Sequence, residues 1–330
     1  MQCVITVVTS VKRAAEKTIS NNFSKMKKVI AIGQSVLDIV HLDGKPVASY
    51  TGGRIANMAS SLGRCGIHVE YVSECANDKI GDMVVDFLKS NNVGTGSIDR
   101  FTDGKSQVSL IFRDLNGKED YAEYVSYPDT RFNVLWPRIE EGDIVVFGSY
   151  FAIDSKPRKG LLELLNYARE RKAVIVYLPG FHKELCTRIT RVMPEILENL
   201  EYADLVIARQ ADMEIIFDKS DALASYNDHI KFYCPNFVFT DSNNGMQIFS
   251  SSTCKVLEFA DCPPQNRLGK DAAVAAGIVY GMLKENVNLD TVNSIPALAW
   301  EGIARCGVEF ANECIKSGQN IVSKEFANNK

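Results

Sequence analysis

The sequence predicts an α/β fold, a three-layer sandwich in which helices cover both faces of a mostly parallel central sheet. Short apolar runs alternate with amphipathic stretches from residue 29 onward, and this alternation is typical of parallel strands joined by helices. Several runs, such as 144–147, are apolar at every position, as expected for strands covered on both faces. Residues 106–125 break the alternation and predict a second, smaller sheet.

The elements of the sandwich follow from these patterns in chain order. In the segment 80–91, Val84, Phe87 and Leu88 fall on one face of a helix. The leucine-rich segment 161–171 predicts another helix, and the small residues from 271 to 281 predict a closely packed one. Strands of the main sheet are expected at 29–32, 69–73, 144–147, 174–177, 205–207 and 237–240.

The smaller sheet is predicted from a hairpin pattern. The extended runs 106–112 and 121–125 flank Asn116-Gly117, a pair that strongly favours a tight hairpin turn. With residues 47–51 these runs can form a small antiparallel sheet set off from the main body. An ordinary surface hairpin is the alternative.

Composition excludes several classes of protein. The 330 residues are 46% hydrophobic, enough for one large core with a small appended sheet. The formal net charge is −4 and the basic residues are scattered, which argues against a nucleic-acid partner. No apolar run approaches the ~18 residues of a membrane span. Nine cysteines without a Cys-x-x-Cys pair indicate free thiols in a reducing, cytoplasmic compartment.

The first 25 residues differ from the rest of the chain. They carry several Lys, Ser and Asn residues, and Met26-Lys27-Lys28 resembles a natural start. We therefore expect residues 1–25 to be disordered or an over-extended start, and residues 26–330 to form one domain.

Asp271 is the strongest candidate for a catalytic residue. It follows Gly269 and Lys270 and opens the small-residue run of the last predicted helix. Backbone N–H groups at such a helix start can bind an anion, and the carboxylate can accept a proton from a hydroxyl group. An ordinary helix cap is the alternative for Asp271.

A second cluster near the other end of the chain suits a polyhydroxylated ligand. Gly52-Gly53 allows a ligand to approach the backbone, and Asn57, early in the next helix, offers a donor and acceptors. Asp38 follows the strand 29–32 and adds a carboxylate. Each of these residues has an ordinary structural explanation, so their co-occurrence with Asp271 carries the functional interpretation.

Together these motifs resemble the PfkB (ribokinase-like) carbohydrate kinase family. The family's first signature is met by Gly52, Gly53, Asn57, Leu62 and Gly66. Its second signature aligns with residues 265–271 and retains Gly269 and Asp271, whereas Leu268 and Lys270 stand where the family has glycine. The resemblance covers residues 27–315. It implies a ribokinase-like fold in which the small sheet, about 45–52 and 104–127, is a lid over the sugar.

The resemblance also implies nucleotide and metal sites. The family's nucleotide loop aligns with Thr240 to Gly245 and includes Ser242, and its metal-linked Asn-x-x-Glu element falls on Arg209 to Asp212, with Glu214 nearby. Arg209 is therefore a nucleotide-side candidate, and Asp212 and Glu214 are candidate ligands of Mg²⁺. The family's Asp-x-Asn-x-Arg stretch falls on residues 178–182 and has lost its polar groups.

These features predict an ATP- and Mg²⁺-dependent kinase for a hydroxymethyl group of a small sugar or polyol. Asp271 is expected to be the base, Gly269 and Lys270 to lie at the transferred phosphate, and Asp38, Gly52, Gly53 and Asn57 to bind the sugar. Lys270 can point either to the ligand or to solvent. The alternatives are a sugar-binding paralogue with weak or no kinase activity, because of the altered motifs, and a nucleoside kinase.

The lid predicts an oligomeric state. A small sheet with an exposed apolar face is marginal in water, and pairing two lids across a two-fold axis would bury that face. We therefore expect a homodimer built through the lid. Ile111 is the position at which an aspartate would disrupt the interface, if its side chain faces outward.

Overall fold

The structure is a computed structural model that describes residues 27–115, 119–181, 189–241, 245–251, 254–258 and 269–330. The predicted N-terminal tail, 1–25, lies outside these residues, as does the turn at Asn116-Gly117.

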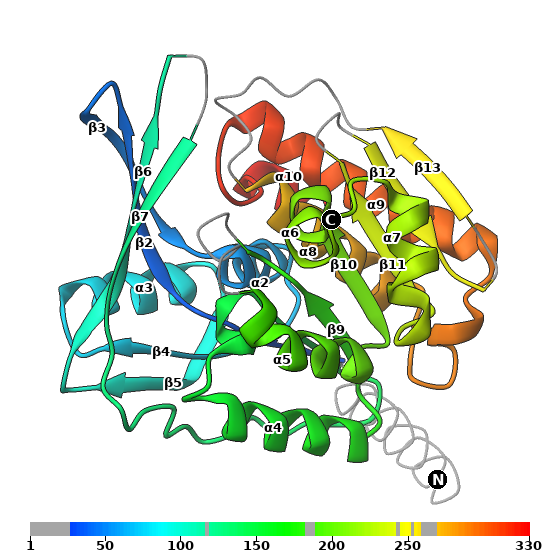
Figure 1. Cartoon of the computed structure of the whole chain (residues 1–330), viewed down its shortest axis with the longest axis horizontal. Coiled ribbons are helices and arrows are strands. Elements are labelled where there is room, and N and C mark those ends of the chain that lie inside the picture. The colour runs from blue at the N-terminus through cyan, green and yellow to red at the C-terminus, as the bar shows by residue number, and fades with distance from the viewer. Residues whose placement is uncertain (1–26, 116–118, 182–188, 242–244, 252–253, 259–268) are drawn as a thin grey trace, which may run out of the picture.

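A nine-stranded sheet forms the centre of the described chain (Figure 1). The strands that pair in parallel run from β11 at one side, through β8 at the middle, to β5 at the other edge, and β12 and β13 add antiparallel strands beyond β11. In spatial order the strands are β13 (Cys254–Glu258), β12 (Gly245–Phe249), β11 (Phe237–Thr240), β10 (Leu205–Arg209), β9 (Val174–Leu178), β8 (Ile144–Gly148), β1 (Val29–Ile32), β4 (Val69–Ala76) and β5 (Val93–Phe101).

Helices cover both faces of the sheet, which confirms the predicted three-layer sandwich. Alternate residues of β1 enter different clusters: Val29 and Ala31 pack with α2, α8 and α9, whereas Ile30 and Ile32 pack with α4 and α5. The helices are α2 (Arg54–Arg64), α3 (Lys79–Ser90), α4 (Arg158–Glu170), α5 (Ile189–Tyr202), α6 (Gln210–Phe217), α7 (Ala222–Asp228), α8 (Lys270–Lys284), α9 (Ala297–Ser317) and α10 (Lys324–Asn328).

The second sheet is the predicted lid, and it stands off from the main body (Figure 1). Its order is β3 (Lys45–Gly52), β2 (Val36–Leu42), β6 (Lys105–Arg113) and β7 (Glu119–Ser126). Asp38 follows β1, as expected, but it lies within a separate strand, β2, that begins at Val36 and that was not predicted from the sequence. Apolar and polar side chains alternate weakly in β2, which hid this strand in the sequence.

Helix α8 is buried almost throughout, and at two of its glycines it lies too close to α9 for any side chain to fit. A methyl group at Gly277 would lie 2.3 Å from the carbonyl oxygen of Cys306, and one at Gly281 would lie 2.7 Å from Cα of Ile303. Backbone atoms cannot retreat as a flexible side chain can, so these glycines set the distance between the two helices.

We predict that Gly277→Ala lowers the free energy of unfolding by about 1–3 kcal/mol, because the added methyl group forces α8 and α9 apart. The matched control is Gly302→Ala in α9, where a methyl group would meet only Glu285 Oε1 at 3.5 Å. The control should be neutral or stabilising by up to about 1 kcal/mol, since alanine favours helix over glycine. Urea unfolding of both variants checks this, and equal behaviour of the two would contradict the packing.

Candidate active site

A cavity of about 290 Å³ lies between the lid and the carboxyl ends of strands β8, β9 and β10. Ligands of open α/β sheets bind at this edge. The lid contributes one wall, and the first turns of α2 and α8 contribute another. The lining residues are Gln34, Val36, Asp38, Gly53, Arg54, Asn57, Gln107, Ser109, Ile111, Glu119, Tyr121, Glu123, Ser149, Tyr150, Gly180, Arg209, Gly269, Asp271 and Ala272.

Six of the predicted catalytic, sugar-binding and nucleotide-binding residues line this one cavity, although they come from both ends of the chain. Gly52 and Lys270 lie beside the cavity but are not part of its lining. The ammonium-bearing side chain of Lys270 is buried, with 7% of the residue exposed, so it does not point to solvent. The six that line the cavity are Asp38, Gly53, Asn57, Arg209, Gly269 and Asp271.

Asp271 is held in the first turn of α8 by the geometry of Gly269. Gly269 has a φ of 83°, in the left-handed region that favours glycine, and its carbonyl accepts the N–H of Ala273 at 2.9 Å. A methyl group at Gly269 would lie 2.4 Å from Cα of Asn320. The start of α8 therefore packs directly against the backbone of Asn320, which follows α9.

Asn320 joins this helix start to the first glycine cluster. Its Nδ2 donates to Oδ1 of Asn57 at 3.0 Å, inside a buried pair. On the other side of Asn57, a methyl group at Gly52 would lie 2.1 Å from the same oxygen. These contacts explain why Gly52 is glycine and fix the amide of Asn57. Sequence reasoning missed Asn320, because an asparagine after a helix carries no signal of its distant partner.

The lid presents a row of acidic and hydroxyl groups to the cavity. Asp38 pairs in register with Ser109, and Ser109 pairs with Glu123, so the three side chains lie side by side on one face. Burial, and then the charge of Glu123, raise the pKa of Asp38 to about 7. Nearby, the hydroxyl of Tyr121 donates to Glu119 Oε2 at 2.6 Å. Alternation along β6 and β7 could have revealed this face, since residues two apart share a side.

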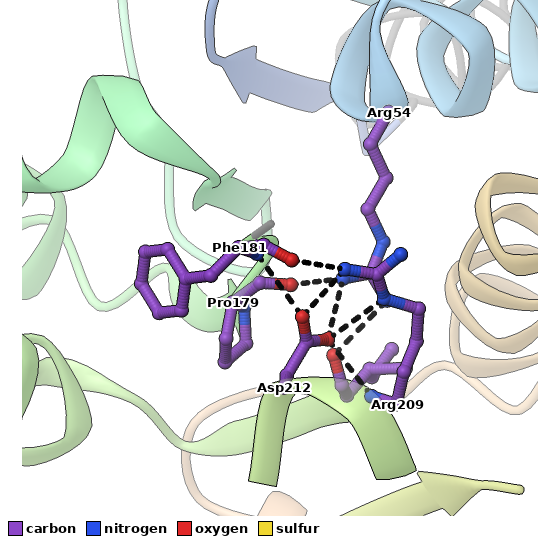
Figure 2. A network of polar contacts seen from close by, with 6 residues as sticks. Arg54, Pro179, Phe181, Arg209 and Asp212 are labelled. Carbon is purple, nitrogen blue, oxygen red and sulfur yellow. Dashed lines mark hydrogen bonds and ion pairs between the residues drawn. The ribbon is translucent and has the colours of Figure 1, made fainter. Parts of the chain in front are cut away.

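A buried ion-pair network forms the floor of the cavity (Figure 2). Asp212, in the first turn of α6, has a side chain with 0% exposure. Arg209 donates to it through Nη2 at 2.6 Å and through Nε at 3.0 Å. Arg54, from the start of α2, reaches the same carboxylate through Nη1 at 3.3 Å. One carboxylate thus holds two guanidinium groups that both line the cavity.

The backbone after β9 completes the network. Pro179 O accepts from Arg54 Nη1, and Phe181 O accepts from Arg209 Nη2 at 3.1 Å. The N–H of Phe181 donates to Asp212 Oδ1 at 3.1 Å. This segment is the one in which the sequence has apolar residues and glycine in place of the family's charged side chains, and here its peptide groups bind the arginines instead.

The charge states of the network follow from its contacts. Burial alone would raise the pKa of the Asp212 carboxyl. The charge and hydrogen bonds of Arg209, and to a smaller extent the charge of Arg54, outweigh burial and lower that pKa. Burial lowers the pKa of Arg54. For Arg209 burial acts in the same direction, yet the charge of Asp212 outweighs it and raises the pKa. Asp212 and Arg209 are therefore charged at neutral pH, and Arg54 is charged as well because a guanidinium group keeps its proton in proteins.

The predicted metal ligands do not fit a metal site at this cavity. Both oxygens of Asp212 accept N–H groups, and neither Asp212 nor Glu214 lines the cavity. Glu214 is exposed and accepts from Gln210 Nε2 at 2.8 Å. In the part of the chain that the structure describes, no three His, Cys, Asp or Glu side chains are grouped as a metal site requires.

The predicted nucleotide residues at β11 and β12 lie apart from this cavity lining. Thr240 ends β11 and is buried, and Gly245 begins β12, where its N–H donates to Asp241 Oδ1 at 2.7 Å. Ser242 lies outside the described residues. Arg209, the fourth predicted nucleotide-side residue, is the one that lines the cavity.

Comparison with known proteins agrees with this architecture. The model of the family described as pfkB family carbohydrate kinase matches residues 26–324. The chain belongs to the pfkB family of carbohydrate kinases. It is therefore a phosphotransferase of the PfkB type. The kinases of this family use ATP.

Individual relatives are distant in sequence and close in fold. A Pyrococcus horikoshii protein described as an uncharacterized sugar kinase is 21% identical, over 78% of this chain and 83% of its own. The Arabidopsis thaliana protein called probable fructokinase-6, chloroplastic, is 22% identical over 87% of this chain and 76% of its own.

Two solved structures show the shared fold. Fructokinase from Vibrio cholerae O395, bound to fructose, ADP and calcium, has a TM-score of 0.74 at 15% identity, over 92% of this chain and 96% of its own. Aminoimidazole riboside kinase from Salmonella enterica, complexed with aminoimidazole riboside and an ATP analogue, has a TM-score of 0.75 at 15% identity. The match covers 92% of this chain and 98% of the kinase. At these identities the likeness shows the fold alone.

Among the described residues, no helix of this PfkB protein is long and apolar enough to cross a bilayer.

We predict that Asp38→Asn stabilises the protein above pH 7. The carboxyl of Asp38 keeps its proton up to about pH 7 in the folded chain but only to about pH 4 when unfolded. The free energy of unfolding should therefore fall as pH rises between these two values. Asparagine cannot ionise, so the variant should gain up to about 4 kcal/mol over the wild type at pH 8, from about three pKa units at about 1.4 kcal/mol each, and little at pH 4.5. Urea unfolding at both pH values checks this, and a gain that does not grow with pH would contradict the assignment.

Proposed function

We propose that this PfkB protein is an ATP-dependent kinase that phosphorylates a hydroxymethyl group of a small sugar or related polyol, with Asp271 as general base. The observation that carries the proposal is the shared cavity of Asp38, Asn57 and Asp271. Its 290 Å³ is at the small end of ligand pockets, which suits a ligand of monosaccharide size.

The cavity supplies groups for each part of the sugar. The carboxylate of Asp38 and the amide of Asn57 can accept and donate hydrogen bonds to adjacent hydroxyl groups. Gly53, with a φ of 105°, exposes its backbone to the ligand beside them. Burial of Asp38 and Asn57 strengthens these interactions, because water competes less.

Asp271 is positioned to take the proton of the acceptor hydroxyl. The oxygen of that hydroxyl attacks the terminal phosphorus of ATP, the bond to ADP breaks, and the proton passes to the Asp271 carboxylate. Backbone N–H groups at the start of α8 have no partner within the helix and favour the negative phosphate there. Gly269 allows this close approach, and its contact with Asn320 keeps the helix start in place.

The nucleotide is proposed to extend from this helix start toward Thr240, Ser242 and Gly245. The family resemblance supports the placement, as do an ADP-bound and an ATP-analogue-bound structure of the same fold. Mg²⁺ commonly reaches such sites on the phosphates of the nucleotide and keeps most of its waters. Because Asp212 and Glu214 do not fit as its ligands, no step is assigned to them.

A nucleoside is the second candidate acceptor. The riboside kinase of Salmonella enterica shares this fold as closely as the fructokinase of Vibrio cholerae does. A panel of sugars and ribonucleosides, each tested with ATP and Mg²⁺, separates the two candidates. A binding protein without kinase activity would bind members of the panel and transfer no phosphate.

We predict that Asp271→Asn lowers kcat by about 10²–10⁴-fold while acceptor binding is retained, because the amide keeps the shape of the side chain but cannot accept the proton. Single-turnover assays and calorimetry measure the two quantities. Asp290→Asn, at an exposed position, is the matched control and should be fully active. Normal phosphate transfer by the Asp271 variant would remove its catalytic role, and a wild type inactive on the whole panel would contradict the proposed function.

We also propose that the protein is a homodimer built through the outer face of its lid. The condition set for Ile111, that its side chain faces outward, is not met, because Ile111 is 4% exposed and lines the cavity. Its neighbours in β6 face the other way: Phe112 is 40% exposed, and Tyr124 on β7 is 61% exposed. Such an apolar face on a small sheet favours association with a second copy.

We predict that Phe112→Asp shifts the dimer to a monomer, because a charge would have to lose its water in the interface. Leu298→Asp, in α9 and at 81% exposure, is the control and should leave the oligomer unchanged. Light scattering coupled to size exclusion measures both. A monomeric wild type, or an undisturbed dimer of the Phe112 variant, would reject the lid interface.

A further inference from the structure

The arginine pair on the cavity floor is not balanced by its own carboxylate. Asp212 offers one negative charge to Arg209 and Arg54, and both guanidinium groups carry a positive charge. The arginines line the cavity, whereas Asp212 is buried behind them. The two arginines and Asp212 together carry one net positive charge, and the charge of Asp271, which lines the same cavity and acts on both arginines, balances it.

In the described part of the chain, Arg209 has N–H donors that make no hydrogen bond. A guanidinium group has five N–H donors. Nε and Nη2 of Arg209 are used by Asp212 and by Phe181 O, at 2.6 to 3.1 Å. Within the described residues Nη1 has no hydrogen-bond partner. Arg54 adds a second unused donor, because its Nε is buried and without a partner in the described structure.

The network also holds these donors in place before any ligand arrives. Asp212 accepts the backbone N–H groups of Arg209 at 3.0 Å and of Phe181 at 3.1 Å, so the carboxylate cannot rotate freely. Its bidentate contact with Arg209 fixes the plane of the guanidinium. Donors that are already oriented stabilise a developing charge without reorganisation during the reaction.

We propose that Arg209, with Arg54 beside it, is an anion site that binds a phosphate group of a ligand directly, in the place where the sequence suggested metal ligands. This inference rests on the proposed function. The guanidinium groups form no covalent bond in the step: the acceptor oxygen bonds to phosphorus, ADP leaves, Asp271 takes the proton, and the arginines bind the oxygens of that phosphate group throughout. Asp212 is then a positioning residue for the arginines.

Phosphate could reach this site from two sources. It can be the terminal phosphate of a nucleotide or a phosphate group on the acceptor itself, and guanidinium recognises the same oxygens in either case. The orientation of the ligand differs between the two, so their affinities report which one the site is built for. Inorganic phosphate reports the site alone.

The test measures anion binding without turnover and without metal. Calorimetry in EDTA is done with inorganic phosphate, ATP and fructose 6-phosphate on wild type, Arg209→Gln, Arg209→Lys and the control Arg305→Gln. Arg305 lies on α9 and pairs with Glu301 at the surface. We expect the wild type to bind at least one of the three, Arg209→Gln to bind it about 10–100-fold more weakly, and Arg305→Gln to match the wild type.

Arg209→Lys keeps the charge without the planar fork and should lose about 3–10-fold. If Arg209→Gln fails to fold, the lysine variant decides. Tighter binding of ATP than of the sugar phosphate identifies the nucleotide as the source, and the reverse identifies the acceptor. Wild-type protein that binds none of the three anions without metal, or an Arg209 variant with unchanged affinity, would overturn the inference.

A kinase assay separates this inference from the proposed function. Arg209→Gln should require a higher Mg²⁺ concentration for half-maximal rate than the wild type, because less protein charge remains at the phosphate. Activity of the wild type with an unaltered Mg²⁺ requirement in the variant would reject the arginine site and leave the kinase function intact. An inactive wild type that still binds phosphate through Arg209 would reject the kinase function and leave the arginine site intact.

Discussion

The close packing of helix α8 places the two halves of the active site together. Its glycines allow α9 to approach backbone to backbone, and Gly269 lies against Asn320 with no space for a side chain. Asn320 in turn holds the amide of Asn57. Because the contacts involve backbone atoms, they leave little freedom, and Asp271 faces the cavity that α2 also lines. The positions of the proposed base, Asp271, and of the proposed sugar-binding amide, Asn57, thus depend on the same few contacts.

The cavity built on this packing is electrically asymmetric. Carboxylates of Asp38, Glu119 and Glu123 project from the lid, whereas Arg54 and Arg209 lie on the floor. Charges interact more strongly where water is excluded. A ligand with hydroxyl groups at one end and phosphate at the other would match this arrangement, with the hydroxyl groups under the lid and the phosphate on the floor. Asp271 lines the same cavity from the first turn of α8.

Sequence patterns predicted the features that depend on local composition. The main parallel sheet, the lid and the family followed from apolar runs, hairpin residues and glycine motifs. The candidates Asp38, Asn57 and Asp271 lie in one cavity, but their roles in the reaction remain predictions. The strand that carries Asp38 was not predicted, since β2 lacks a clear alternation. The sequence left open which face of the lid Ile111 occupies, because the register between strands cannot be deduced from one sequence.

Long-range contacts were beyond sequence reasoning for a physical reason. Asp212 resembles a metal ligand by its position in a motif, yet its role is set by Arg54, which comes from a distant helix, and by peptide groups after β9. Asn320 likewise acquires its role only through Asn57 and Gly269. Neither pairing leaves a local pattern, because the partners meet only when the sheet has formed.

The most direct test is a crystal structure with an accepted sugar and a non-hydrolysable ATP analogue. The account predicts the acceptor hydroxyl within about 3 Å of the Asp271 carboxylate, its other hydroxyl groups on Asp38 and Asn57, and the terminal phosphate on Arg209. A sugar bound outside this cavity, or an Asp271 carboxylate turned away from the acceptor hydroxyl, would contradict it.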